Sequence, residues 1–417
     1  MRRRRLLGGA LAASAWAYAC SLPPDRAFAE ATSGRLAPVM LGGDRFLAED
    51  WRELAGRGVG LVTNQTGHTS AGVPLVDAIR HNPAIALRAL YAPEHGLRGD
   101  QPAGHYVPSY LDPATQLPVY SLYGPTRKPT AAMLAGIDVL LFDIQDVGDR
   151  TYTFISTLAE VMAAAQAFGK SVWVLDRPNP LGGAIVEGPV LEPRFASFIG
   201  LYPLPIRHGL TIGEVAQLYR THFGIDCDLR VLAMDGYSRA MFWPETGLWW
   251  VPTSPKIPTW ETAFVYPATG LLAQAGINNA TETATPFFEA GAYQLDGAQL
   301  ARYLQARDVP GIDFAPALWT PEAGFWQGKT LSGVRLAVVD RAAYRAVRTA
   351  VEILCAVRAI APDHLVIRNP LGLARDWGTD SLRRGLLAGQ SPDEILAAWE
   401  PHTRTFVAER GDVLLYD

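Results

Sequence analysis

Three strongly apolar segments constrain the fold of this chain more than any other feature. Residues 59–63, 139–144 and 171–175 form almost continuous apolar runs that show no polar alternation. Strands of this kind are buried on both faces, as in parallel sheets covered by helices. Residues 154–168 separate the last two runs with helical periodicity and end at Gly169, a typical helix C-cap. We therefore predict an α/β fold built on a Rossmann-like, doubly wound parallel sheet.

The same reasoning predicts further elements in the first half of the chain. Strands are expected over 85–91 and 119–122, and helices over 73–80, 130–136 and 211–223. Thr211 and Glu214 are spaced as a capping box, which marks the start of the last of these helices.

The second half of the chain follows a different pattern, and 417 residues are too many for one ordinary domain. Helical segments at 342–359 and 392–399 and a strand-like segment at 331–339 predict a smaller α+β domain. We expect a Rossmann-like catalytic domain over residues 40–275 and a smaller α+β C-terminal domain over residues 276–417.

The N-terminus predicts export. Arg2–Arg5 precede an apolar run over 6–19 that is short for a membrane span, and 27–29 reads Ala-Phe-Ala, a small-x-small cleavage site. Residues 1–29 are therefore expected to be a signal peptide of the twin-arginine type, directing the protein to the periplasm or outside the cell. The alternatives are a single membrane anchor and a lipoprotein attached through Cys20. After residue 30 no stretch predicts a membrane span, and whether Cys227 and Cys355 pair is left open.

Several classes of function are disfavoured. The net charge is −4 and no basic block follows the first five residues, so nucleic acid is not an expected partner. The chain has no GxGxxG fingerprint, no CxxC or HExxH zinc motif and no GxSxG elbow. We therefore expect no cofactor, and neither a dinucleotide enzyme nor a serine hydrolase.

Polar residues gather where the predicted strands end, which is where open α/β sheets bind ligands. The strand ends carry Asn64, Glu94, Asp143, Gln145, Asp146 and Asp176. The loops that follow add Gln65, His95, Arg98, Asp149, Arg150, Arg177 and Asn179. Two carboxylates facing a sugar can cleave a glycosidic bond, so this edge predicts a glycosidase site.

The role of each acid has an alternative. A desolvated Glu94 would have a raised pKa and suit a general acid, or it would pair with Arg98 and fix its loop. Asp146 and Asp143 are candidates for the second carboxyl role. They would otherwise cap a helix, or, with His208, hold a metal ion. His208 could instead donate to substrate or bond to backbone, and Tyr266 could stack on a sugar or be a core anchor.

Eight segments resemble one known family. They are LVTNQTG (61–67), APEHGLRGD (92–100), SLYGPTRKPT (121–130), DVLLFDIQDVGDRTYTFISTL (138–158), VLDRPNPLGG (174–183), VEGPVLEP (186–193), PIRHGLTIGE (205–214) and VPTSPKIPT (251–259). In order and spacing they resemble the NamZ/YbbC-like exo-β-N-acetylmuramidases.

This resemblance implies release of N-acetylmuramic acid from the non-reducing end of peptidoglycan fragments during cell wall recycling, with Glu94 as the catalytic glutamate. Asp146 and Asp143 remain candidates for the second carboxylate. The expected substrate-binding residues are Asn64, Gln65, His95, Arg98, Gln145, Arg150, Tyr152, Asp176, Arg177, Asn179, His208 and Asn278.

One segment departs from the family pattern. Residues 273–292 keep Asn278 but lack the arginine that family members often carry there. If that arginine holds the lactyl carboxylate, then Arg98 or Arg150 is expected to substitute for it. A glycosidase with another amino-sugar preference, a non-catalytic periplasmic sugar-binding protein and a metal-dependent hydrolase are the alternative hypotheses.

Overall fold

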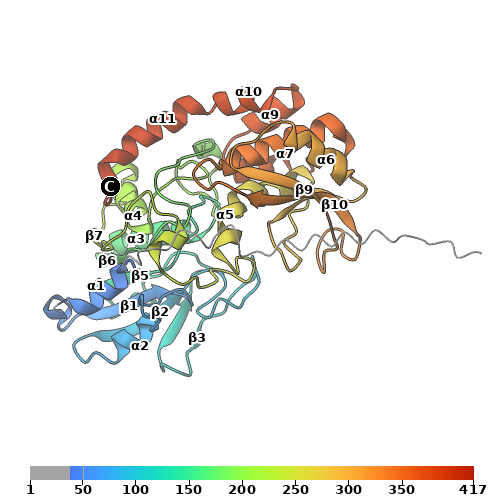
Figure 1. Ribbon diagram of the computed structural model, residues 1–417. Helices are drawn as coiled ribbons and strands as arrows, with labels where there is room; N and C mark the ends of the chain where they lie inside the picture. Colours follow the sequence, from blue (N-terminus) through green and yellow to red (C-terminus); the bar gives the residue numbers. More distant parts are fainter. Residues whose placement is uncertain (1–37, 50) are drawn as a thin grey trace, which may run out of the picture. The chain divides into compact units, whose positions relative to one another are not determined.

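The computed structural model describes residues 38–49 and 51–417, and Ala37–Asp417 forms one compact unit (Figure 1). The predicted signal peptide at 1–29 and Cys20 lie outside the described residues. Within those residues, no helix is both long enough and apolar enough to cross a bilayer.

A seven-stranded sheet forms the N-terminal half, as the apolar runs predict. Its order is β3-β4-β2-β1-β5-β6-β7, with β3 antiparallel to β4 and all other neighbours parallel. The strands are β1 (Gly58–Thr63), β2 (Ala86–Ala92), β3 (Tyr110–Leu111), β4 (Pro118–Ser121), β5 (Val139–Asp143), β6 (Ser171–Leu175) and β7 (Asp228–Leu232). The apolar-run pattern does not single out the edge strands β3 and β7, because β3 is exposed and β7 only partly buried.

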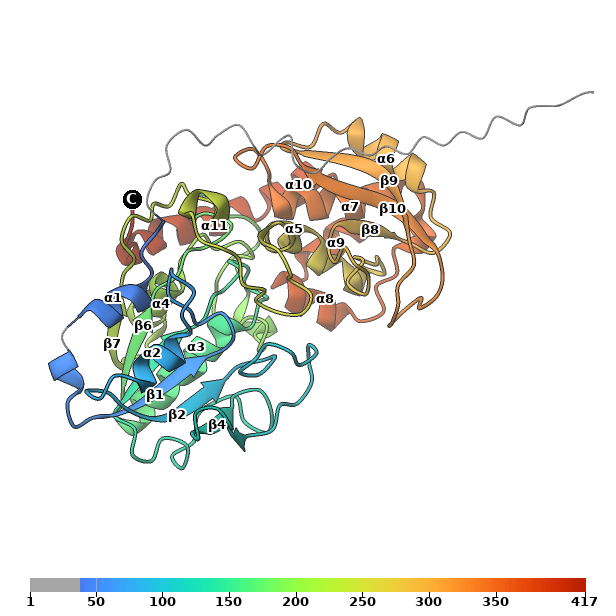
Figure 2. The same ribbon diagram turned by 60° about the horizontal axis from the view of Figure 1, so that its bottom comes forward.

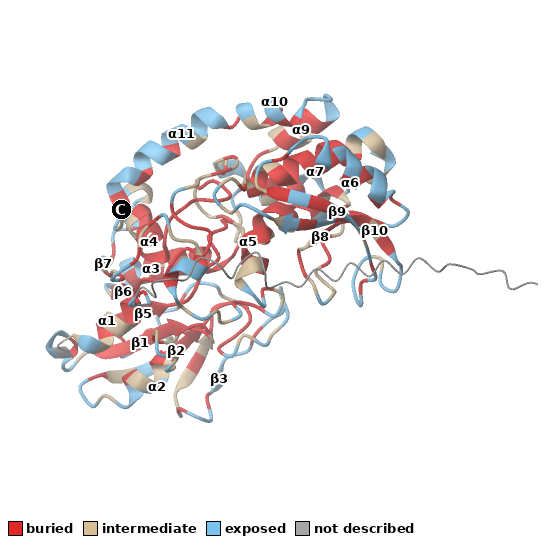
Figure 3. Cartoon of the chain, viewed as in Figure 1, coloured by how far each residue is buried: buried red, intermediate tan, exposed pale blue. Residues whose placement is uncertain are grey.

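Successive side chains of the central strands enter two separate cores, which explains why the strands are apolar throughout. Leu61 and Trp173 pack with Phe46 under α1 (Gly42–Ala48) and α2 (Leu75–Arg80). Val62 and Val174 pack on the other face with α3 (Phe154–Phe168) and α4 (Ile212–Phe223). Figure 3 shows these strands as buried along their length.

Local sequence signals set the ends of both covering helices. Gly169 ends α3 in the left-handed conformation, with φ of 62°, and Thr211 caps α4 by accepting a bond from the Glu214 amide. The helix predicted over 130–136 is wrong, because 131–136 forms only turns. Pro129 and Gly136 leave room for about two helical turns, too few to be stable without strong packing.

A three-stranded antiparallel sheet forms the core of the smaller C-terminal part, in the order β8-β10-β9 (Figure 2). Its strands are β8 (Glu289–Ala292), β9 (Ile312–Trp319) and β10 (Leu331–Val338). The helices are α5 (Trp260–Thr269), α6 (Gly297–Gln305), α7 (Ala346–Ile360), α8 (Pro370–Trp377), α9 (Ser381–Leu387), α10 (Pro392–Ala397) and α11 (Glu400–Glu409). Short 3₁₀ helices lie at Trp51–Leu54, Pro193–Phe195, Trp243–Thr246, Gly270–Ala275, Pro362–His364 and Arg410–Val413. The α/β sheet with a smaller α+β part is thus confirmed.

The end of the chain returns to the first sheet. In Figure 1, α11 runs back toward α4, and the Tyr416 hydroxyl donates to Asp176 Oδ2 over 2.5 Å. The Leu415 amide donates to Glu214 Oε1 over 2.9 Å. The last residues therefore help to build the N-terminal half, while the predicted boundary between 275 and 276 stays a prediction.

Candidate active site

A cleft of about 620 Å³ lies beyond the carboxyl end of β2, between the large sheet and the C-terminal part. Its walls come from several separated segments, which include the loop after Glu94, the start of α3 and the loop before α5. The lining side chains used below are Glu94, His95, Asp100, His105, Tyr123, Tyr152, Thr153, Lys256, Tyr266, Glu282 and Phe287.

Glu94 is fixed in this cleft and is only 8% exposed. One carboxylate oxygen accepts the Gly104 amide over 2.8 Å, and the other accepts the Thr153 hydroxyl over 2.7 Å. Positive φ angles at His95 (70°) and Gly96 (76°) turn the chain immediately after it. The expected alternative, a pair with Arg98, does not form, since Arg98 bonds Asp112 over 3.1 Å.

Aromatic hydroxyl groups surround the acid. Burial, and next the charge of Glu94, raises the pKa of Tyr123 to about 12. Tyr152 donates to the Thr253 hydroxyl over 2.8 Å, and burial raises its pKa well above the usual range. Both phenols therefore stay protonated at neutral pH, and each hydroxyl oxygen can accept a hydrogen bond from a sugar hydroxyl.

Tyr266 forms an aromatic wall of the cleft. Its ring lies edge-to-face against Phe287, with centroids 4.9 Å apart, and against Tyr152, with centroids 5.9 Å apart. Of the residues predicted to act on or bind a sugar, Glu94, His95 and Tyr152 line this cleft. His95 is held by a 2.7 Å contact between Nδ1 and the Gln101 carbonyl oxygen.

Asp143 is fully buried and does not line the cleft. Its Oδ1 forms a 2.6 Å ion pair with Arg177, whose guanidinium also donates to the His68 carbonyl over 2.7 Å. Arg177 and Gln145 instead line a cavity of about 20 Å³ beside Trp249. Asp143 and Arg177 therefore form an ion pair inside the fold.

Asp146 is also internal, at 6% exposure, and does not line the cleft. Its Oδ2 accepts the Gly148 amide over 2.7 Å, and burial raises its pKa to about 8. An acid with that pKa is mostly protonated at pH 7 and is a poor nucleophile or base there.

Asp149 and the predicted binding residue Arg150 hold loops together. Asp149 accepts bonds from the Thr151 amide and hydroxyl, both over 2.7 Å. Arg150 is buried and donates to the carbonyl oxygens of Ile199 and Asp376. Neither Arg150 nor Arg98 lines the cleft, so the structure does not place either as the replacement for the missing family arginine.

The loops after β6 and before α4 are joined to each other by hydrogen bonds. Asp176 accepts from the Thr211 hydroxyl over 2.8 Å and the Gly213 amide over 2.7 Å. Asn179 donates to the Leu210 carbonyl over 2.9 Å, and His208 Nδ1 accepts the Leu210 amide over 3.2 Å. Burial lowers the pKa of His208 to about 3, so it is neutral.

Asn64, Gln65 and Asn278 lie outside the cleft. Asn64 Oδ1 accepts the Thr66 amide and hydroxyl, and Gln65 donates to the Pro252 carbonyl over 2.8 Å. Both line a separate cavity of about 220 Å³ that also includes Arg98. Asn278 accepts the Trp319 indole N–H over 2.9 Å and lines a further cavity of about 460 Å³.

Neither a metal cluster nor a disulfide is found in the described part of the chain. Residues 38–49 and 51–417 contain no group of three His, Cys, Asp or Glu side chains suited to a metal ion. The metal site suggested for Asp143, Asp146 and His208 is therefore not formed. Cys227 and Cys355 are free, buried in different cores, and burial raises each thiol pKa to about 11.

Comparison with known proteins decides the family. The family description "Exo-beta-N-acetylmuramidase NamZ, N-terminal" matches residues 59–261, and its C-terminal counterpart matches residues 264–416. The chain belongs to the NamZ exo-β-N-acetylmuramidase family. The predicted family and enzyme class, a glycoside hydrolase, are thereby confirmed.

Individual relatives agree along nearly the whole chain. The peptidoglycan β-N-acetylmuramidase NamZ of Bacillus subtilis (strain 168) is 40% identical over 398 residues, covering 95% of each chain. A solved DUF1343 family protein of Bacteroides fragilis NCTC 9343 matches with a TM-score of 0.85 at 34% identity, covering 91% of this chain and 99% of that one. A second from that organism has a TM-score of 0.72 at 25% identity, with the same coverage.

Among the residues of this NamZ-family cleft that sequence reasoning did not select are Tyr123, Lys256 and Glu282. The first two lie inside segments that carry the family resemblance, SLYGPTRKPT and VPTSPKIPT. Tyr123 directly follows the strand predicted over 119–122, so the strand-end rule could have found it. Lys256 follows no predicted strand, so the rule does not select it. Glu282 lies in the divergent segment 273–292.

Proposed function

We propose that this enzyme releases N-acetylmuramic acid from the non-reducing end of peptidoglycan fragments, with Glu94 as the general acid. The observation that carries the proposal is a buried, doubly hydrogen-bonded carboxyl group that faces the cleft of a NamZ-family chain. The relative from Bacillus subtilis is named for the same sugar and polymer.

The proposed step follows general acid catalysis. The Glu94 carboxyl proton passes to the glycosidic oxygen as the bond from that oxygen to the anomeric carbon breaks. The leaving sugar departs as an alcohol, and water supplies the hydroxyl group of the released N-acetylmuramic acid. The remaining proton of that water restores the Glu94 carboxyl group, directly or through solvent. The Gly104 amide and the Thr153 hydroxyl fix the orientation of the carboxylate that remains.

The cleft supplies the other contacts that a sugar needs. Tyr266 offers an aromatic face of the kind that packs on sugar rings, and the Tyr152 and Tyr123 hydroxyls lie beside the acid. The proposed step uses neither Asp143 nor Asp146, since neither side chain lines the cleft.

The site of action is proposed to be outside the cytoplasmic membrane, in the periplasm or beyond. Arg2–Arg5 with the apolar run over 6–19 support this, because they are typical of an export signal. The proposed substrate is a cell-wall fragment, which agrees with that location.

The test is hydrolysis of chromogenic β-N-acetylmuraminide and β-N-acetylglucosaminide by the mature protein. We expect cleavage of the muraminide. The variant Glu94→Gln should lose that activity, because the amide cannot protonate the leaving oxygen. If the wild-type protein cleaves neither glycoside, the proposed function fails.

A further inference from the structure

The cleft has an unusual charge distribution for an acidic substrate. Among the described residues that line it, three carry carboxylates, Glu94, Asp100 and Glu282, and Lys256 is the only lysine or arginine. N-Acetylmuramic acid carries a lactyl carboxylate. With Glu94 protonated, as the proposed step requires, that carboxylate still meets the acidic side chains of Asp100 and Glu282, which repel it unless a cation receives it.

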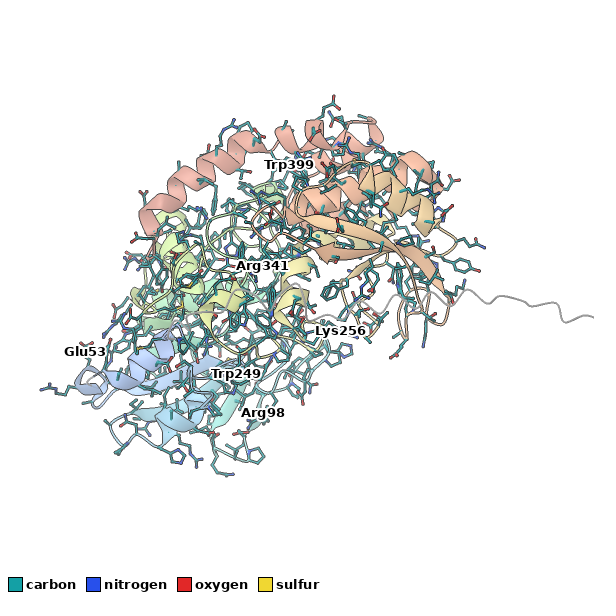
Figure 4. The ribbon with its side chains drawn as sticks, viewed as in Figure 1. Glu53, Arg98, Trp249, Lys256, Arg341 and Trp399 are labelled. Atoms are coloured by element: carbon teal, nitrogen blue, oxygen red, sulfur yellow. The ribbon has the colours of Figure 1, made fainter. Side chains whose placement is uncertain are left out.

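Lys256 is placed to be that cation. Its loop is anchored because the Ile257 amide donates to the Ser254 carbonyl over 3.1 Å and the Trp250 indole donates to the Ile257 carbonyl over 3.3 Å. Ile257 is 1% exposed, whereas the Lys256 side chain is 38% exposed. In the view of Figure 4, Lys256 lies between the large sheet and the orange C-terminal part, while Arg98 lies beside the blue N-terminal strands.

In the absence of substrate the Lys256 ammonium is paired. Its Nζ lies 2.7 Å from Glu282 Oε2, and the Glu282 side chain is also 38% exposed. Partly exposed ion pairs are weak, so an incoming carboxylate can compete for the lysine. Glu282 lies in the segment 273–292, which lacks the arginine expected by family resemblance.

We propose that Lys256 binds the lactyl carboxylate of N-acetylmuramic acid, and that Glu282 holds the lysine until the sugar replaces it. This inference rests on the proposed function, since it names the group that makes the cleft select an acidic sugar over its neutral analogue. An ammonium group suits this task because it is a point charge that can exchange one carboxylate partner for another.

The alternative is that the pair only clamps the loop of Lys256 to the segment of Glu282. The two ideas predict different changes in sugar binding when Lys256 and Glu282 are each replaced. If the pair only holds the two segments together, then Lys256→Met and Glu282→Gln break the same contact and weaken the binding of both sugars alike. If Lys256 binds the lactyl carboxylate, removing the lysine weakens the binding of the acidic sugar only, and neutralising Glu282 strengthens that binding.

The experiment measures binding of free N-acetylmuramic acid and free N-acetylglucosamine by calorimetry, so that it does not depend on turnover. We expect Lys256→Met to raise the Kd for N-acetylmuramic acid by about 10-fold or more and to leave that for N-acetylglucosamine within about twofold. Glu282→Gln should lower the Kd for N-acetylmuramic acid. Lys329→Met is the matched control, since Lys329 lies over the Tyr293 ring and outside the cleft.

Steady-state kinetics on the chromogenic muraminide provide a second measurement, of KM and kcat. Lys256→Met should raise KM by about the same factor with little change in kcat, and Lys256→Arg should restore part of the loss. Equal weakening of both sugars by Lys256→Met and Glu282→Gln overturns the inference, as does a wild-type protein with no preference for the acidic sugar. Failure of wild-type turnover with an intact, Lys256-dependent preference would overturn the proposed function alone.

Discussion

Glu94 and Asp176 start from the same position in the fold and end in opposite environments. Both are acids just past the carboxyl end of a parallel strand, β2 for Glu94 and β6 for Asp176. Glu94 faces an open cleft, whereas Asp176 is fully buried and accepts bonds from Thr211, Gly213 and Tyr416. The end of a strand therefore places an acid at the binding edge of the sheet. The loops that cover the acid then determine whether substrate can reach it.

The largest expected effect concerns Asp143, which is fully buried, as Asp176 is. Arg177→Met leaves the fully buried Asp143 carboxylate without its 2.6 Å partner. We expect a loss of about 3–5 kcal/mol in the free energy of unfolding, because an uncompensated charge remains in the core. Chemical denaturation measures it.

The matched control is Arg98→Met. Arg98 pairs with Asp112, but its side chain is 58% exposed, so its removal should cost about 1 kcal/mol or less. If the two variants unfold at the same denaturant concentration, enclosure of the arginine does not set the cost of losing its ion pair.

A smaller effect is expected at Asp176. Tyr416→Phe removes the hydroxyl that donates to Asp176 Oδ2 and that also accepts the Met234 amide over 2.8 Å. Losing these bonds should destabilise the protein by about 1–3 kcal/mol without changing kcat, since the cleft is untouched. Tyr303→Phe, at an exposed position, is the control, and a large fall in kcat for Tyr416→Phe would show that Asp176 takes part in turnover.

The smallest expected effect is a pH dependence at Asp376. Burial raises its pKa to about 7 against an ordinary 3.8, so the folded state keeps a proton that the unfolded state releases. This group therefore destabilises the fold progressively as pH rises from about 4 to about 7. Asp376→Asn should match the wild type in Tm near pH 4 and exceed it by about 1–3 °C at pH 8.

Asp308→Asn, at an exposed position, should show no such trend. A constant difference in Tm between Asp376→Asn and the wild type at every pH would mean that the substitution acts through packing and not through the proton.

The sequence predicts the sheet and its edge well because both depend on local patterns. The apolar runs at β1, β5 and β6 and the caps of α3 and α4 are each readable within a few residues. Glu94, His95 and Tyr152 reach the cleft as predicted. The helix expected over 130–136 fails because a short segment with good end signals still lacks enough helical turns.

The division between open and internal acids could not be predicted, because long-range contacts set it. One partner of Asp176 is Tyr416, 240 residues later in the chain, and the partner of Lys256 is Glu282, in another segment of the cleft lining. Asp146, the expected second carboxylate, is buried by loops whose packing no local pattern reports. Such contacts appear only when the tertiary fold is known.

The most direct test of the account compares Glu94→Gln with Asp146→Asn on the chromogenic muraminide. Both changes replace a carboxyl group by an amide of nearly the same shape, and burial already raises the pKa of Asp146 to about 8. The account predicts that Glu94→Gln lowers kcat by at least about 100-fold with an unchanged Tm, and that Asp146→Asn keeps kcat within about threefold. Near-normal turnover by Glu94→Gln, or loss of turnover by a folded Asp146→Asn, would contradict it.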